Sequence, residues 1–119
     1  MCRQTTQMFT FETHGRGLHD ITVRIARTAA DTGIAAGMVT LFLRHNSASL
    51  LIQENAGPDV LGDLERFMVR LIPDADPFYR HRDEGPDDMP AHVRAALTAV
   101  QLAVPMTNGR LMLGTWQAI

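Results

Sequence analysis

The pattern of apolar and polar residues predicts a first helix near the start of the chain. Ile21, Ile25 and Ala29 lie four residues apart, so a helix would place them on one face. Gly33 follows them and is the residue type that most often ends a helix, because glycine readily adopts a left-handed backbone conformation. These signals predict a helix over residues 20–33.

A second and longer helix is predicted after the Gly57–Pro58 pair. Proline is favoured in the first turn of a helix because the N–H that it lacks has no partner there. An apolar stripe then runs to residue 72; its members are Val60, Leu61, Leu64, Phe67, Met68, Leu71 and Ile72. Pro73 ends this helix, and another short helix is predicted from Pro90 onward.

Apolar residues at alternate positions predict strands in the first half of the chain. Phe9 and Phe11 produce this pattern over residues 7–13, which favours an opening strand with one face on the core. The almost continuous apolar run 38–43 is typical of a strand buried on both faces. Residues 48–53 predict an extended segment with one apolar face and one unusually polar face.

The C-terminal part of the chain predicts a β-hairpin. Apolar residues alternate over 100–104, which favours a strand. Asn108–Gly109 is the pair preferred in two-residue type I′ turns, and we expect it to lead into a strand over residues 111–116. Trp116 is interpreted as a core anchor in that strand, with its two neighbours facing the opposite side.

The length of 119 residues and the mixture of helices and strands predict a single α+β domain. The net charge of -2 disfavours a nucleic-acid partner, because such surfaces usually carry a basic excess. Cys2 is the only cysteine, so no intrachain disulfide can form and a reducing compartment suits the chain. No apolar run resembles a signal peptide or a membrane span, and we therefore expect a cytoplasmic protein with no membrane partner.

Ionisable side chains are concentrated in the long loop over residues 73–90 and just after it. The segment from Tyr79 to His92 contains two imidazoles, two guanidinium groups and four carboxylates around a Gly–Pro turn. Nitrogen and oxygen donors suit a divalent ion, whereas cations suit a phosphorylated substrate, and the segment offers both. Asp87 and Asp88 also precede a helix, so capping is an alternative role for them.

Two candidate residues lie outside this loop. His45 follows an apolar strand, where it is either a metal ligand or a hydrogen-bond partner of a nearby carbonyl. Glu54 is either a ligand or a solvated strand end. The spacing from His81 to His92 matches no zinc-finger or HExxH signature, so spacing alone does not establish a metal site. The absence of a P-loop, a Rossmann fingerprint and a G-x-S-x-G elbow disfavours the corresponding enzyme classes.

Five segments carry a resemblance to a known family: His45 to Leu50, Gln53 to Asn55, Tyr79 to His81, Glu84 to His92, and Asn108 to Gln117. In order and in sequence they closely resemble the YjbQ-like family. The resemblance implies a compact α+β domain with packed β-sheet layers and two to three helices. It also implies a homotrimer with a polar pocket for a divalent metal ion, either zinc or magnesium.

The resemblance further implies roles for individual residues. The metal ligands are expected to be His45, His81 and His92, and the catalytic residues are expected to be Glu54, Arg80, Asp87 and Asp88, with Glu84 as a further acidic position and Arg82 as an alternative to Arg80. Family members usually continue past Gln117 through another strand with a Cys-Glu-His-Arg-like motif. Residues 1–119 are therefore expected to form one domain that lacks this strand.

Members of this family are commonly described as secondary thiamine-phosphate synthases. The resemblance thus implies a metal-assisted enzyme that joins hydroxymethylpyrimidine diphosphate to thiazole phosphate and releases pyrophosphate. The alternative is a trimeric metal-binding or small-ligand-binding protein whose synthase activity is incidental. Hydrolysis by a metal-bound water is a third hypothesis, although no general base stands at a diagnostic spacing.

Overall fold

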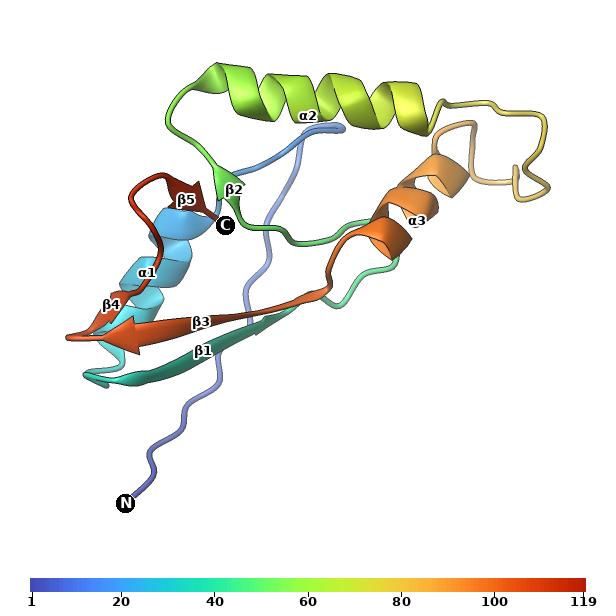
Figure 1. Ribbon diagram of the computed structural model, residues 1–119. Coiled ribbons are helices and arrows are strands. Elements are labelled where there is room, and N and C mark those ends of the chain that lie inside the picture. Colours follow the sequence, from blue (N-terminus) through green and yellow to red (C-terminus); the bar gives the residue numbers. More distant parts are fainter.

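Two antiparallel sheets organise the chain in a computed structural model that describes residues 1–119 (Figure 1). The larger sheet has the order β1–β3–β4 and joins β1 (Gly37–Phe42), β3 (Gln101–Thr107) and β4 (Arg110–Leu111). The smaller sheet pairs β2 (Gln53–Glu54) with β5 (Gln117–Ala118). Antiparallel sheets together with separate helices confirm the predicted α+β class.

Three helices accompany the sheets, α1 (Thr22–Asp31), α2 (Pro58–Leu71) and α3 (Asp88–Leu97). The first two agree with the sequence pattern. Gly33 adopts a φ of 69° after α1, as expected of a C-terminal cap, and Pro58 occupies the first turn of α2. The third helix begins at Asp88 and not at Pro90, so Asp88 and Met89 lie on the helix itself.

The hairpin turn was predicted correctly, but the strand after it was not. Asn108 and Gly109 have φ angles of 52° and 71°, both positive as a type I′ turn requires. The ladder with β3 ends at Leu111, and a tight turn follows in which the N–H of Gln117 donates to the carbonyl of Gly114 (3.0 Å). As a result Trp116 is 60% exposed, and the prediction of a core anchor is wrong.

The opening strand predicted over residues 7–13 is also wrong, because these residues pair with no strand. The guanidinium of Arg24 on α1 lies 4.8 Å from the ring centroid of Phe9 and 4.7 Å from that of Phe11. It also donates a hydrogen bond to the carbonyl of Thr10 (3.0 Å). The aromatic residues therefore pack against a helix arginine and not in a sheet.

The core lies between α1 and one face of the larger sheet. Ile25, Val104 and Ile119 form its buried centre, and half-buried residues pack against them; these are Phe9, Ile21, Val39, Leu41, Ile52, Leu102, Leu111 and Leu113. The chain end is fixed to α1, because the N–H of Ile119 donates to the Thr22 hydroxyl (2.8 Å) and its carbonyl accepts from Ile21 (2.9 Å).

The other face of the larger sheet is uncovered. Met38 and Phe42 on β1 are 61% and 66% exposed, so the prediction that residues 38–43 are buried on both faces is wrong. The chain measures 55 × 29 × 22 Å, and only 7 of its 119 residues are buried. The predicted extended segment 48–53 is reduced to an isolated bridge between Leu50 and Ala99, followed by β2.

None of the three helices combines the length and the apolar composition that crossing a membrane requires.

Asp20 offers a test of how α1 is joined to the rest of the fold. Its Oδ1 accepts a hydrogen bond from the N–H of Thr22 (2.8 Å), and its Oδ2 accepts one from the side-chain amide of Asn55 (2.6 Å). The Thr22 side chain is the main reason why the pKa of Asp20 lies below its ordinary value of 3.8, against an opposing effect of burial.

We predict that Asp20→Ala lowers the free energy of unfolding by about 1 kcal/mol at neutral pH. Because the pKa of Asp20 is lowered in the folded state, its contribution is complete above the ordinary value and is lost as the pH falls through the lowered value. Urea unfolding at neutral and acidic pH should show the two proteins converging in acid. Asp31→Ala, at the opposite end of α1, serves as the control and should cost nothing.

Candidate functional site

One carboxylate oxygen holds two imidazoles at the beginning of α3. Oδ2 of Asp88 lies 2.8 Å from Nε2 of His81 and 3.1 Å from Nε2 of His92. Asp88 and His92 are four residues apart on α3, so the helix places them on the same face, whereas His81 comes from the preceding loop. The ligand atoms of the three residues all lie within 4.8 Å of one another.

The orientation of His92 is set by the main chain of a distant segment. Its Nδ1 lies 2.8 Å from the carbonyl oxygen of Asn46, which can only accept a hydrogen bond. We therefore assign a proton to Nδ1, which leaves the Nε2 lone pair as the free ligand position of the neutral ring. Because Nε2 also faces an acceptor, the space between Nε2 and Asp88 suits either a second proton or a metal cation.

Asp88 is held in its charged form. Its pKa lies below the ordinary value of 3.8, first because of the hydrogen bond from His81. Partial burial opposes this effect, while a Coulomb interaction with His92 and smaller contributions from Glu84 and His81 lower the pKa of Asp88 further. A charged carboxylate next to two imidazoles is the form that binds a divalent cation.

The segment that carries Asn46 is bound to the short connection between α3 and β3, residues 98–100. The N–H of Leu43 donates to the carbonyl of Val100 (2.8 Å), and Leu50 and Ala99 exchange two backbone hydrogen bonds. Between these contacts, the hydroxyl of Thr98 donates to that of Ser49. The loop 43–50 is therefore held against the connection that directly follows α3, the helix that bears Asp88 and His92.

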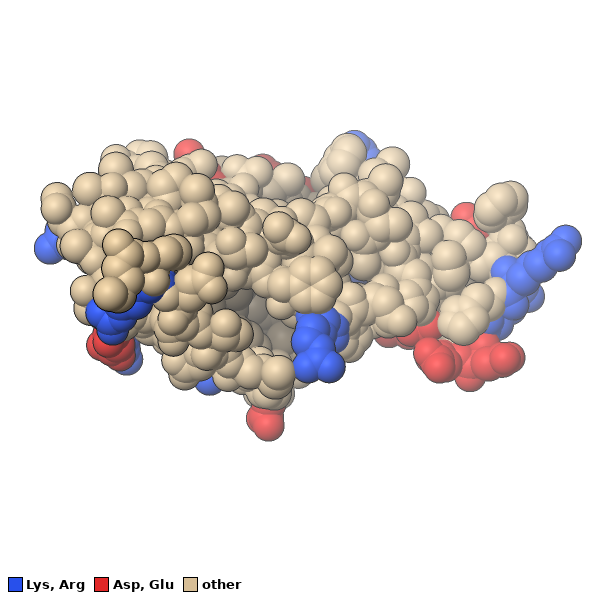
Figure 2. All heavy atoms as spheres, turned by 90° about the horizontal axis from the view of Figure 1, so that it is seen from below, with Lys and Arg blue, Asp and Glu red and all other residues tan.

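The loop that carries His81 is held by hydrogen bonds between its two ends and within it. The N–H of Ala75 donates to the carbonyl of Pro86 (2.9 Å), which closes the base. Arg82 spans the loop by donating to the carbonyls of Tyr79 and Pro77, both at 2.7 Å. Figure 2 shows charged side chains of both signs gathered at one end of the molecule, the end at which Figure 1 places this loop.

His45 stands apart from the cluster in its contacts. Its Nδ1 accepts a hydrogen bond from the N–H of Ser47 (3.0 Å) and lies 3.2 Å from the Ser47 hydroxyl. A neutral ring with an accepting Nδ1 carries its proton on Nε2, which makes that nitrogen a hydrogen-bond donor. His45 is absent from the group whose ligand atoms converge, so its role as a metal ligand stays a prediction.

The other predicted catalytic residues take different positions. Asp87 occupies the N-cap position of α3 but forms no side-chain cap hydrogen bond, so the structure shows no capping contact for this residue. Arg80 is exposed and has no protein partner, in contrast to Arg82. Glu54 lies on β2, away from α3 in sequence and sheet, and it lines a separate hollow.

One site group was missed by the sequence-based prediction, namely the backbone carbonyl of Asn46. A main-chain acceptor leaves no trace in residue type, and only the path of the chain places it near α3. The position of Asn46 directly after His45 was the sole available signal.

The donor set fits a zinc ion. Four tetrahedral bonds of about 2.0 Å separate neighbouring ligand atoms by about 3.3 Å. Separations of 2.8 and 3.1 Å between Asp88 and the two histidines are close to this value, and all three ligand atoms lie within 4.8 Å of one another. Three protein ligands leave the fourth position for water or substrate, as catalytic zinc sites do.

Comparison with known proteins gives consistent matches along the chain. Residues 7–119 match the family described as UPF0047 protein YjbQ-like. A UPF0047 protein of Synechocystis is 48% identical over 117 residues, which cover 98% of this chain and 80% of the relative. The UPF0047 protein YjbQ of Escherichia coli O157:H7 is 40% identical over 92% of this chain and 80% of its own length. A conserved hypothetical protein of Thermus thermophilus has a similar structure, with a TM-score of 0.76 and 35% identity over 86% of this chain and 76% of its own.

The missing cap contact of Asp87 generates a prediction about stability. Replacing a working N-cap by alanine typically costs about 1 kcal/mol, because a backbone donor loses its partner. Asp87 forms no such contact, so we predict that Asp87→Ala changes the free energy of unfolding by less than about 0.5 kcal/mol. Urea unfolding measures this change. A loss of about 1 kcal/mol or more would show that Asp87 caps α3 in solution.

Proposed function

The chain belongs to the UPF0047 YjbQ-like family, and from this premise we propose that it is a metal-assisted enzyme acting on small phosphorylated substrates. Its metal ligands are His81, Asp88 and His92. One observation carries the proposal: a charged carboxylate and two imidazole Nε2 atoms converge at the edge of α3, with one ring oriented by a backbone carbonyl. This combination is typical of metal sites in which the second partner of a histidine fixes its tautomer.

Zinc suits this donor set better than magnesium. Imidazole nitrogen is a good ligand for zinc, whereas magnesium prefers oxygen atoms and retains several waters. Two of the three ligand atoms here are imidazole nitrogens. A bound zinc ion would supply Lewis-acid stabilisation of negative charge on a phosphate oxygen.

The specific reaction that we propose follows the family resemblance and is thiamine phosphate formation. The bond between the pyrimidine methylene carbon and the diphosphate oxygen breaks, and its electron pair leaves with pyrophosphate. The ring nitrogen of the thiazole phosphate forms the new carbon–nitrogen bond with its lone pair. The chemical demand on the protein is therefore to stabilise negative charge on the departing diphosphate.

Two groups suit that demand, each adjacent in sequence to a residue that belongs to the cluster or contacts it. Arg80 is one residue from His81, and its guanidinium has no protein partner and is exposed, so it is available to a phosphate. His45 is one residue from Asn46 and carries its proton on Nε2, which suits donation to an oxygen of the leaving group. Arg82 is already bound to two carbonyls and is not assigned this role.

Metal titration tests the ligand set. We predict that His92→Ala and Asp88→Ala each weaken zinc binding by at least roughly tenfold to a hundredfold, because each removes a donor or the charge that holds the imidazoles. His45→Ala should retain zinc affinity but lower the rate of pyrophosphate release, since its Nε2 is a donor. Calorimetric titration with zinc and with magnesium, together with a pyrophosphate assay, measures both properties.

His14→Ala is the matched control, because His14 is exposed and makes no hydrogen bond to the protein. It should leave zinc binding and turnover unchanged. Undiminished zinc affinity in His92→Ala contradicts the proposed ligand set. Loss of zinc affinity in His45→Ala restores the three-histidine prediction in place of the one proposed here.

A second proposal concerns assembly and follows from the uncovered sheet face. The exposed partners across β1 and β3 are all uncharged; they are Met38 and Pro105, Thr40 and Ala103, and Phe42 and Gln101. Seen from below in Figure 2, the molecule carries few charged atoms away from its edges. An uncharged face of this kind, with Met38 and Phe42 exposed on a chain that has few buried residues, supports self-association, and the homotrimer implied by the family resemblance is the assembly that we propose.

We predict that the chain has a mass near three times 13.2 kDa in solution and that Phe42→Glu lowers this mass. Burying a charged carboxylate in an apolar interface is costly, so the substituted face cannot remain covered. Phe78→Glu is the matched control, because Phe78 is a more exposed phenylalanine in the loop before α3. Light scattering measures the masses, and a monomeric parent protein contradicts the proposal.

A further inference from the structure

The loop between α2 and α3 forms a compact unit that contacts the rest of the chain at few points. Figure 1 shows it projecting beyond the adjoining ends of both helices. Its two ends meet, because the N–H of Ala75 donates to the carbonyl of Pro86 (2.9 Å). None of residues 75–86 is buried, and most are exposed. A segment with so few buried contacts opens at a lower free energy than the core does.

Internal hydrogen bonds give this loop a shape of its own. Arg82 donates to the carbonyls of Pro77 and Tyr79, both at 2.7 Å. The N–H of Phe78 donates to the carboxylate of Asp76 (2.9 Å). Each of these bonds joins one part of the loop to another part of the same loop. The loop can therefore move as one body without breaking them.

Two backbone positions near the ends of the loop suit a hinge. Ala75 has a φ of 56° and Gly85 has a φ of 104°, so both lie in the left-handed region. Glycine adopts this region freely, whereas the Cβ of alanine disfavours it. The strain at Ala75 persists only while the surrounding contacts hold it. It is relieved when the loop turns out of its present position.

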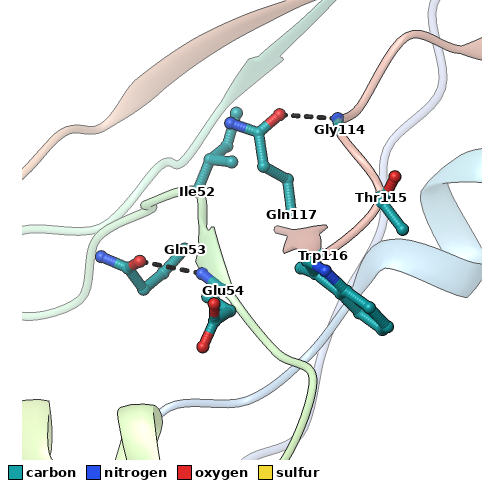
Figure 3. A pocket seen from close by; sticks show the side chains of 7 residues that line it. All are labelled: Ile52, Gln53, Glu54, Gly114, Thr115, Trp116 and Gln117. Carbon is teal, nitrogen blue, oxygen red and sulfur yellow. Dashed lines mark hydrogen bonds between the residues drawn. The ribbon is translucent and has the colours of Figure 1, made fainter.

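His81 supplies the main contact that holds the loop against α3. Its Nε2 lies 2.8 Å from Oδ2 of Asp88, and its ring packs edge-on against that of His92 with the centroids 5.6 Å apart. The turn before β5 is attached differently, because Gln117, which closes this turn onto Gly114, is itself a residue of β5 (Figure 3). Moving that turn breaks a sheet, whereas moving the loop breaks the contacts of an exposed imidazole.

We propose that residues 75–86 are a hinged lid over the metal cluster, held closed by His81. The lid turns at Ala75 and Gly85, and opening removes His81 from the cluster and exposes the site on α3 to a substrate. Closure brings the exposed guanidinium of Arg80 to a bound diphosphate and excludes water from the reacting bond. The inference rests on the proposed function for the ligand that the lid covers, but the motion itself needs no metal.

Trypsin cleavage after Arg80 measures opening of the lid, because a protease acts on a locally opened chain. In the metal-free protein we predict that Asp88→Ala raises this rate about fivefold, the size expected when an exposed hydrogen bond to a charged group is lost. Asp87→Ala is the matched control, because it removes the neighbouring carboxylate, which forms no side-chain cap hydrogen bond. It should be cleaved at the parent rate. Cleavage after Arg94 on α3 reports unfolding of the rest of the chain and should not change in either variant.

A hinge variant tests the motion from the other side. Gly85→Ala places a Cβ where φ is 104°, so it should favour the open lid and raise cleavage after Arg80. Gly15→Ala is its matched control, because Gly15 has a φ of 95° in a loop outside the lid, and it should leave this rate unchanged.

Three outcomes overturn the proposal: cleavage of Asp88→Ala after Arg80 at the parent rate, equal acceleration after Arg80 and Arg94, or equal effects of Gly15→Ala and Gly85→Ala. Zinc added to the parent protein should slow cleavage after Arg80, because the ion also holds His81. If zinc has no effect while the metal-free results hold, the metal site fails and the lid stands.

Discussion

The carboxylate of Asp88 joins the loop before α3 to the first turns of the helix, because it contacts a histidine from each. Its Oδ2 lies 2.8 Å from Nε2 of His81 in the loop and 3.1 Å from Nε2 of His92, one turn along α3. His92 in turn donates to the segment after β1 through Asn46. Because one negative charge satisfies two imidazoles, the loop, the helix and the strand end share a single electrostatic centre. The bracing by Arg82 and the backbone contacts of residues 43–50 serve to keep these three parts in register.

Much of the fold follows from local sequence signals, and the errors have a common physical cause. Capping glycine, first-turn proline and the Asn108–Gly109 turn depend on backbone preferences of single residues, and all three were predicted correctly. The two wrong predictions, an opening strand and a buried Trp116, concern features that depend on tertiary contacts with distant segments. Phe9 belongs to an alternating pattern typical of a strand, but its ring packs against Arg24 of α1 and its segment pairs with no strand. Alternating apolar residues indicate that one face is covered, but they do not show whether a strand or a helix covers it.

The candidate site was predictable in its residue types but not in its connections. The segment around His81 and His92 stood out by composition, and the structure does bring these two histidines together with Asp88. The exclusion of Asp87 from the cluster depends on where α3 begins, which local pattern placed two residues too late. The tautomer of His45 depends on a contact with Ser47 that only coordinates reveal.

The contact between His92 and Asn46 has an unusual property for a group that orients a metal ligand. The acceptor belongs to the peptide backbone, so every amino acid at position 46 supplies it. The position can therefore vary in side chain without altering the ring of His92. The same contact is sensitive to the length of the loop between β1 and the Leu50–Ala99 bridge. Removing one residue from this loop would move the carbonyl away from His92, although all three ligands would still be present in the sequence. Spacing along this loop, and not residue identity within it, is what preserves the orientation of the site.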